Sequence, residues 1–244
     1  MDAMILAAGL GTRLGAITRD IPKALVDVAG TTALERVASA LIGAGADRLI
    51  INVHHHAGRV TEFVASRDAF GVAVVFSHEP DAPLETGGGL LHAAPLFRRD
   101  APFLLHNVDV LCDADLRALL AAHADTGAVA TLAVHERVTS RHLLFDEGRL
   151  VGRQNTNALG GAELCAKTTE PKRIAFAGIH VVEPALLDLI TERGAFSIMD
   201  VYMRLTSDGY HIAAHDITGA QWLEIGNPDR LEAARRALAD SPQE

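Results

Sequence analysis

The stretch Ile5-Leu-Ala-Ala-Gly-Leu-Gly-Thr-Arg-Leu14 decides the fold, together with Ile21-Pro-Lys-Ala-Leu25 shortly after it. The apolar run 3–8 is typical of a buried parallel strand, and it breaks into Gly9 and Gly11. Glycine lets the backbone N–H groups of such a turn come close to a ligand. Turns of this kind after a first strand bind phosphates. The stretch therefore predicts a polyphosphate site at the end of the first strand.

Arg13 and Lys23 add two cations at the edge of this loop. The common glycine-rich phosphate motifs fit the loop poorly. The third glycine of a dinucleotide fingerprint would fall on Leu14, and no acidic residue ends a second strand about twenty residues further on. No Gly-Lys-Ser/Thr follows either, as a Walker A loop requires. A Rossmann-type dehydrogenase remains an alternative that these departures disfavour.

The overall composition is that of an ordinary globular protein with an acidic balance. The 244 residues include 22 basic and 31 acidic side chains, which give a formal charge of −9. This balance argues against binding to nucleic acid or to an anionic membrane. No apolar segment is long enough for a signal peptide or a membrane span. Cys112 and Cys165 lack metal-type spacing, so we expect reduced thiols in a cytoplasmic protein.

Strand and helix patterns alternate along the first half of the chain. Short apolar runs favour strands over residues 3–8, 48–53, 72–77, 102–107 and 127–135. Helices are expected between them, from a capping box at Thr32–Glu35 and then over 58–67, 87–96 and 114–124. This alternation predicts an α/β fold with a doubly wound, mostly parallel sheet.

The pattern changes after about residue 135. Asp146–Arg149 reads as a hairpin turn, and 153–173 as irregular structure or a mobile flap. Further elements are expected as strands over 175–182 and 210–217 and as helices over 184–192, 198–207 and 228–239, the last capped by Asn227. We expect a single domain over 1–244, with a nucleotide-binding half at about 1–135, a β-rich excursion within about 136–227, and a C-terminal helix in 228–244.

Three features follow expected strands or precede a helix: the loop 9–15, the segment Asn107–Asp109, and the segment Thr86–Gly89. Ligands of open α/β sheets bind outside the carboxyl ends of the strands. The three features are therefore expected to converge on one crevice. His54, His55 and His56 are less promising as a metal site, because consecutive strand residues point to alternating faces.

The motifs of this chain resemble those of the sugar-1-phosphate nucleotidyltransferases. The resemblance rests on Leu6–Leu14, Pro22–Leu25, Leu84–Gly89, Leu105–Asp109, Phe176–Ile179 and Trp222–Pro228, which together extend over nearly the whole chain. The Glu-Thr-Gly-Gly-Gly loop is similar to that of the N-acetylmuramate-1-phosphate uridylyltransferase branch. The resemblance implies a Rossmann-like nucleotidyltransferase fold in which the β-rich excursion binds the sugar.

The resemblance also implies site residues. Arg13 and Lys23 would be catalytic, and Asp109 and Glu224 would hold Mg²⁺, a cation that prefers oxygen ligands. The implied nucleotide-binding residues are Leu6, Ala7, Ala8, Gly9, Gly11, Thr12, Arg13, Lys23, Glu79, Thr86, Gly87 and Gly88. The implied sugar-phosphate-binding residues are Asn107, Lys167, Gly178 and His180.

The reaction so implied is nucleotidyl transfer from a nucleoside triphosphate to a sugar 1-phosphate. The loop at Leu84–Gly89 favours UTP and N-acetylmuramate 1-phosphate. Guanylyl or other nucleotidyl transfer to a heptose, mannose or glucose phosphate is an alternative. A sensor that has lost efficient chemistry is another, because Val108 and Glu224 stand where the family usually has glycine and aspartate. The expected partners are these small molecules, and oligomeric state gives no signal in the sequence.

Overall fold

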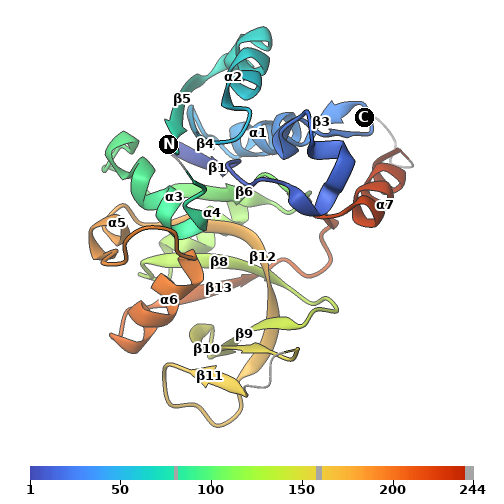
Figure 1. Ribbon diagram of the computed structural model, residues 1–244. Coiled ribbons are helices and arrows are strands. Elements are labelled where there is room, and N and C mark those ends of the chain that lie inside the picture. Colours follow the sequence, from blue (N-terminus) through green and yellow to red (C-terminus); the bar gives the residue numbers. More distant parts are fainter. Residues whose placement is uncertain (80–81, 158–160, 240–244) are drawn as a thin grey trace.

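The computed structural model describes residues 1–79, 82–157 and 161–239. Its centre is a 10-stranded sheet (Figure 1). The strands are β1 (Asp2–Leu6), β4 (Arg48–Val53), β5 (Ala73–His78), β6 (Phe103–Asn107), β8 (Ala130–His135), β9 (Arg141–Asp146), β10 (Arg149–Asn155), β11 (Ala162–Leu164), β12 (Lys172–Val182) and β13 (Ile212–Asp216). The helices are α1 (Ala33–Gly43), α2 (Ala57–Ser66), α3 (Glu85–Ala93), α4 (Leu116–Ala124), α5 (Leu186–Leu189), α6 (Ile198–Ser207) and α7 (Pro228–Ala239).

Two small ribbons and four short 3₁₀ helices complete the described elements. One ribbon joins β2 (Asp27–Val28) to β3 (Thr31–Thr32), and the other joins β7 (Val110–Cys112) to β14 (Trp222–Glu224). The 3₁₀ helices are η1 (Thr12–Thr18), η2 (Lys23–Leu25), η3 (Asp68–Gly71) and η4 (Ala94–Leu96). The second ribbon is the one that matters for the site, because it joins distant parts of the chain.

The sheet is mixed, which corrects the expectation of a mostly parallel, doubly wound sheet. The strands β6, β1, β4 and β5 are parallel neighbours, as the alternation of strands and helices predicted. However, β12 lies antiparallel between β6 and β8, and β10 pairs antiparallel with both β9 and β11. The reason is chain length, because β8, β9 and β10 follow one another too closely for crossover helices.

The segment 153–173 is also more regular than predicted. β10 extends to Asn155, β11 spans Ala162–Leu164, and β12 begins at Lys172. Residues 158–160 of this segment lie outside the described residues. The segment thus contributes strands to one edge of the sheet.

Helix α5 (Leu186–Leu189) is shorter than the helix predicted over 184–192.

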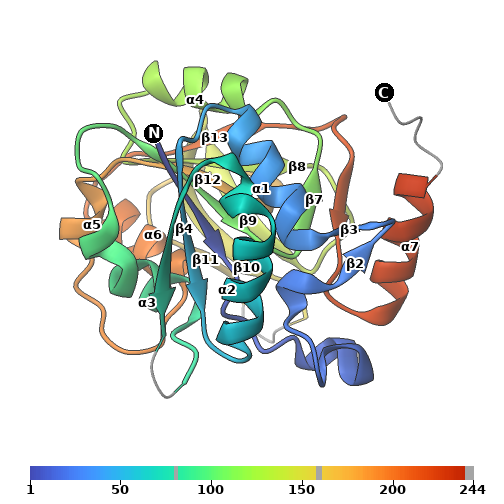
Figure 2. The same ribbon diagram turned by 90° about the horizontal axis from the view of Figure 1, so that it is seen from above.

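Both faces of the sheet are covered by apolar cores. Ala3 and Ile5 face one core together with residues of α1, α4 and α7, whereas Met4 faces the other with residues of α3, α5 and α6. This division follows from the alternation of side chains along a strand. Figure 2 shows α3, α5 and α6 on one side of the molecule and α7 on the other. No helix in the described part of the chain is long and apolar enough to cross a bilayer.

Two predicted helix caps are confirmed. The Thr32 hydroxyl accepts from Glu35 N, and Thr32 N donates to Glu35 Oε2, both over 3.2 Å, so the capping box of α1 is complete. At the start of α7, Arg230 N donates to Asn227 Oδ1 over 2.9 Å. Both helices therefore begin where the local sequence predicted.

Two buried histidines, His106 and His180, lie on the paired strands β6 and β12. His106 is 2% exposed and His180 is fully buried, with His180 Nδ1 2.8 Å from the Tyr202 hydroxyl. Burial lowers the pKa of His106 to about 4 and that of His180 to about 3. Both side chains are therefore neutral in the folded protein at neutral pH.

These histidines predict a loss of stability in mild acid. In the unfolded chain the pKa of a histidine is about 6.5. Below this pH the unfolded state therefore binds more protons than the folded state. The free energy of unfolding should fall with a slope approaching about 1.4 kcal/mol per pH unit for each histidine. Urea unfolding between pH 7.5 and 5 measures this slope. His180→Gln should make the pH dependence of the free energy of unfolding shallower, and His106→Gln is a second variant with the same expected effect. Slopes equal to that of the wild type would show that the two histidines do not cause this pH dependence.

Candidate active site

A cavity opens at the carboxyl ends of β1, β4 and β6. Its lining comes from the loop after β1, the short helix η2, and the segments that follow β4, β5 and β6. The lining residues are Leu6, Ala8, Gly9, Lys23, Asn52, Glu79, Pro83, Glu85, Thr86, Asn107, Val108 and Asp109. The three sequence features that were expected to converge do meet in this cavity.

The glycine-rich loop after β1 turns back on itself at Gly11. Gly11 has a φ of +65°, and its carbonyl oxygen accepts from Leu14 N over 2.9 Å and from the Thr18 hydroxyl over 2.8 Å. Leu14 is anchored in the core, whereas the side chain of Arg13 is exposed. The turn therefore requires glycine and presents Arg13 to solvent at the edge of the loop.

Asn52 ties this loop to the opposite wall, and the sequence analysis missed it. The Asn52 side-chain oxygen accepts from Ala7 N over 2.6 Å and from Ala8 N over 3.3 Å, and Asn52 Nδ2 donates to Glu79 Oε1 over 2.6 Å. Leu84 N donates to the other oxygen of Glu79 over 2.7 Å. A polar residue inside the apolar run 48–53 was the available signal, because buried amides need hydrogen-bond partners.

The same contacts define the surroundings of Glu79. Its side chain lines the cavity, but only 6% of the residue is exposed and both carboxylate oxygens already accept hydrogen bonds. Glu79 therefore holds the chain at Leu84 in place. Contact of this carboxylate with a pyrimidine ring stays a prediction.

Replacing Asn52 by alanine should destabilise the protein by about 2–3 kcal/mol, because it leaves Ala7 N and one oxygen of the buried Glu79 carboxylate, Oε1, without a partner. Urea unfolding measures the change. Asn155→Ala, at an exposed position at the end of β10, is the matched control and should change stability by about 0.5 kcal/mol or less. Equal effects of the two substitutions would show that the Asn52 contacts contribute nothing.

Gly87 and Gly88 are absent from the cavity lining, and their contact with the nucleotide stays a prediction. A Cβ at Gly87 would lie 2.5 Å from the Phe196 ring, and one at Gly88 would lie 2.4 Å from the Gly194 carbonyl oxygen. The N–H groups of both glycines donate to the Phe196 carbonyl oxygen, over 2.9 and 3.2 Å. These glycines let α3 pack closely against the segment before α6, whereas Thr86 lines the cavity.

A charged pair lies at the floor of the cavity. Lys23 Nζ is 2.5 Å from Asp109 Oδ2, and the two side chains are only 9% and 22% exposed. In the ribbon β7–β14, Glu224 pairs with Val110, and Ile225 N donates to the Asp109 carbonyl oxygen over 3.0 Å. The ribbon thus brings the backbone of the two residues predicted to bind metal close together.

The surroundings of Glu224 leave space for its carboxylate. Glu224 forms an ion pair with Arg230, and its side chain is 16% exposed. A Cβ at Gly226 would lie 2.5 Å from Glu224 Oε1 and 3.6 Å from Arg13 Nη2. Glycine at position 226 therefore makes room for this carboxylate, close to the guanidinium of Arg13.

Within residues 1–79, 82–157 and 161–239, no group of three or more His, Cys, Asp or Glu side chains is placed to hold a metal ion. His54 Nδ1 lies 3.4 Å from the Glu79 carbonyl oxygen and His56 Nε2 lies 3.2 Å from that of Arg19. A cation held by Asp109 and Glu224 would take its remaining oxygen ligands from phosphates and water, as Mg²⁺ commonly does.

The residues predicted to bind the sugar phosphate are divided by the structure. Asn107 lines the cavity, and Gly178, with a φ of +84°, lies so close that a Cβ would be 3.0 Å from Asn107 Nδ2. His180 is fully buried against Tyr202 and is absent from the cavity lining, so its contact with the sugar phosphate stays a prediction. Lys167 is exposed in the loop between β11 and β12 and is absent from the cavity lining.

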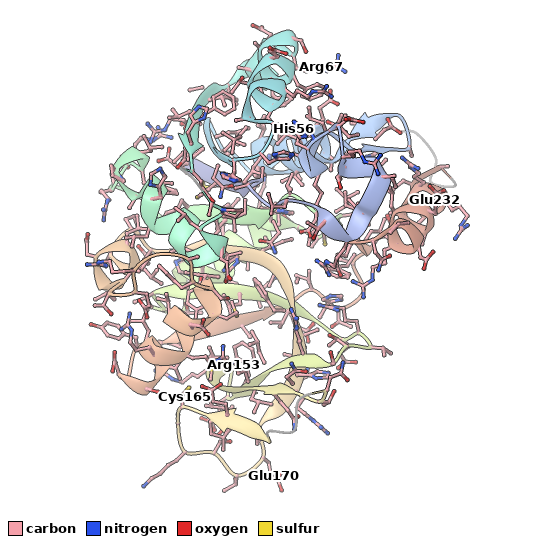
Figure 3. The ribbon with its side chains drawn as sticks, viewed as in Figure 1. His56, Arg67, Arg153, Cys165, Glu170 and Glu232 are labelled. Carbon is pink, nitrogen blue, oxygen red and sulfur yellow. The ribbon has the colours of Figure 1, made fainter. Side chains whose placement is uncertain are left out.

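Lys167 lies between Cys165 and Glu170 in the sequence. Figure 3 shows these two residues at the end of the molecule formed by β10 and β11, away from the strands β1 and β4. The motif spacing that suggested Lys167 could not reveal this placement, because it depends on the antiparallel pairing of β10 with β11.

The chain belongs to the nucleotidyl transferase family, whose model matches residues 2–241. More particularly, it is an enzyme of the sugar-1-phosphate nucleotidyltransferase class, EC 2.7.7. It is 31% identical over 245 residues to an N-acetylmuramate alpha-1-phosphate uridylyltransferase of Caulobacter vibrioides, covering 98% of this chain and 97% of the relative. It is 30% identical over 237 residues to the mannose-1-phosphate guanylyltransferase catalytic subunit beta of Drosophila melanogaster, covering 93% and 59%. A UTP-bound UGPase from Acinetobacter baumannii has a TM-score of 0.78 at 18% identity, covering 99% of this chain and 94% of the other.

Proposed function

We propose that the protein transfers a uridylyl group from UTP to a sugar 1-phosphate, and that N-acetylmuramate 1-phosphate is the preferred acceptor. The observation that carries this proposal is the Lys23–Asp109 pair on the floor of a cavity whose rim is the glycine-rich loop. The choice of base and sugar is supported by similarity over nearly the full length to the Caulobacter relative.

In this reaction an oxygen of the acceptor phosphate attacks the α-phosphorus of UTP, and pyrophosphate leaves in line. The acceptor phosphate is already an anion near neutral pH, so the reaction needs no general base. The protein has to bring two anions together and to stabilise the charge that develops during transfer. Positioning and preorganised cations supply most of such catalysis.

The proposed roles follow from where the cations lie. Arg13 and the N–H groups of Gly9 and Gly11 contact the β- and γ-phosphates that leave. Lys23 lies between the α-phosphate and the acceptor phosphate, with Asn107 and Gly178 on the acceptor side. The remaining proposed nucleotide contacts come from Leu6, Ala7, Ala8, Thr12 and Thr86.

Asp109 and Glu224 would hold Mg²⁺. Asp109 directly precedes β7, Glu224 ends β14 opposite Val110, and Gly226 leaves room beside Glu224. Carboxylate oxygens are ligands suited to this hard cation. When bound, the ion supplies positive charge that offsets the charge of the phosphates. For Glu224 to bind it, the carboxylate must exchange its contact with Arg230.

Pyrophosphate release from a panel of triphosphates and sugar 1-phosphates tests the proposal. We expect the fastest release with UTP and N-acetylmuramate 1-phosphate. The similarity to the Drosophila guanylyltransferase makes GTP with mannose 1-phosphate the second candidate. Nucleotide binding without pyrophosphate release from any pair would favour a sensor of the same fold.

A cytoplasmic location fits the two cysteines, Cys112 and Cys165, which are both free thiols.

A further inference from the structure

Arg137 lies just after β8 and stacks on Trp222 of β14. The Arg137 guanidinium carbon is 4.5 Å from the centre of the Trp222 ring, and Arg137 Nη2 donates to the Phe176 carbonyl oxygen over 3.3 Å. The ring is itself fixed, because Trp222 Nε1 donates to the Ala177 carbonyl oxygen over 2.8 Å and the His135 ring stacks on it at 4.7 Å. The guanidinium is therefore held in one place, although no motif of the sequence pointed to it.

Glu224 lies on the same strand as the tryptophan on which Arg137 stacks. Trp222 and Glu224 are two residues apart on β14, so their side chains share one face of the ribbon. The pKa of Arg137 is lowered overall, mainly by burial. The Glu224 carboxylate raises this pKa in part, and the charge of Arg230 lowers it. Arg137 is thus a further cation whose charge interacts with the carboxylate of Glu224.

The hydrogen-bonding capacity of Arg137 is only partly used. Its Nε is buried and has no hydrogen-bond partner among the described residues. A buried donor of a charged group without a partner is destabilising. The guanidinium presents several donors in a planar fork that matches a carboxylate or a phosphate. An oxyanion at this point would satisfy the unused donors.

The position of Arg137 assigns that oxyanion to the acceptor side. Its neighbour Phe176 lies on β12, two residues before Gly178, which approaches Asn107 at the cavity. The glycine-rich loop and its phosphate-facing N–H groups lie instead after β1, on the other side of β6 in the strand order. Arg137 is therefore hydrogen-bonded to the strand that carries Gly178, next to the proposed acceptor contacts.

We propose that Arg137 binds an oxyanion of the acceptor sugar 1-phosphate and thereby selects anionic acceptors; this rests on the proposed function. The oxyanion has two possible sources, the 1-phosphate itself and the carboxylate of an acidic sugar. In both cases Arg137 is a substrate-binding residue of the acceptor half and makes no contact with the triphosphate.

Trp222 provides a direct measurement, because it is the one tryptophan in the chain. Titration with N-acetylmuramate 1-phosphate should change its fluorescence in the wild type. Arg137→Met should weaken this binding at least about tenfold, because a charge-assisted contact contributes about 1.5–3 kcal/mol. It should raise the KM for the acceptor similarly and leave the KM for UTP unchanged. Arg137→Lys should restore part of the affinity, and Arg59→Met, on the exposed side of α2, is the matched control for charge.

N-acetylglucosamine 1-phosphate distinguishes the two sources, since it lacks the carboxylate of N-acetylmuramate 1-phosphate. Loss of affinity for the muramate alone identifies the carboxylate, and equal loss for both acceptors identifies the phosphate. Unchanged acceptor affinity in Arg137→Met, an equal loss for UTP, or no acceptor binding to the wild type would overturn the inference. Absence of pyrophosphate release from the wild type, with acceptor binding still dependent on Arg137, would overturn the proposed function alone.

Discussion

Replacing Lys23 by alanine is expected to lower kcat at least about a hundredfold, because a preorganised cation at the reacting phosphates is removed. Lys23 is the only lysine that lines the described cavity, and its side chain is nearly buried against Asp109. In the variant, the two phosphates would meet without the ammonium group between them, and the Asp109 carboxylate would face them without its partner. Both changes raise the barrier to attack on the α-phosphorus.

Steady-state pyrophosphate release with the preferred substrate pair measures this effect. Lys172→Ala is the matched control, because Lys172 is exposed and pairs with Asp216 at 3.2 Å, outside the cavity lining. Circular dichroism should show that both variants fold. Turnover of Lys23→Ala within a few-fold of the control would remove Lys23 from the catalytic machinery.

Asp109→Ala should lower turnover by a similar factor, at least about a hundredfold, through loss of a carboxylate that holds the cation. Its second signature is the dependence on Mg²⁺, because the variant should need a higher Mg²⁺ concentration for half-maximal rate. Asp109→Asn keeps the shape of the side chain and separates loss of charge from loss of packing. Asp125→Asn, at the exposed end of α4, controls for the change in net charge.

Lys23 and Asp109 should also behave as a unit. Removing one partner leaves the other as a poorly compensated buried charge, so the double variant should lose less than the product of the two single losses. Strictly multiplicative losses would mean that the contact between the two side chains has no part in catalysis. A normal rate and Mg²⁺ dependence in Asp109→Ala would contradict its role as a metal ligand.

Features that depend on a few neighbouring residues could be predicted from the sequence. The strand before Gly9, the capping box at Thr32–Glu35 and the cap at Asn227 are local, and each lies where expected. The parallel half of the sheet was predictable too, because strands and helices alternate there.

Features that depend on distant partners could not be predicted. The glycines at 87 and 88 were interpreted as ligand contacts, because nothing near them reveals that Phe196 and Gly194 fill the space beside them. The burial of His180 follows from its partner Tyr202 on α6. Arg137 escaped notice because its importance depends on Trp222, a residue much further along the chain.

The ribbon β7–β14 sets an order of events during protein synthesis. Its first strand, β7, directly follows Asp109, whereas its second strand, β14, ends at Glu224. Asp109 and Glu224 therefore leave the ribosome far apart in time. At typical translation speeds the interval is about 6–23 s. A nascent chain can complete β1, β4 and β6 and join Lys23 to Asp109 well before Glu224 exists. Each new molecule therefore passes through a stage in which Lys23 and Asp109 are present and the partner strand of β7 is still missing.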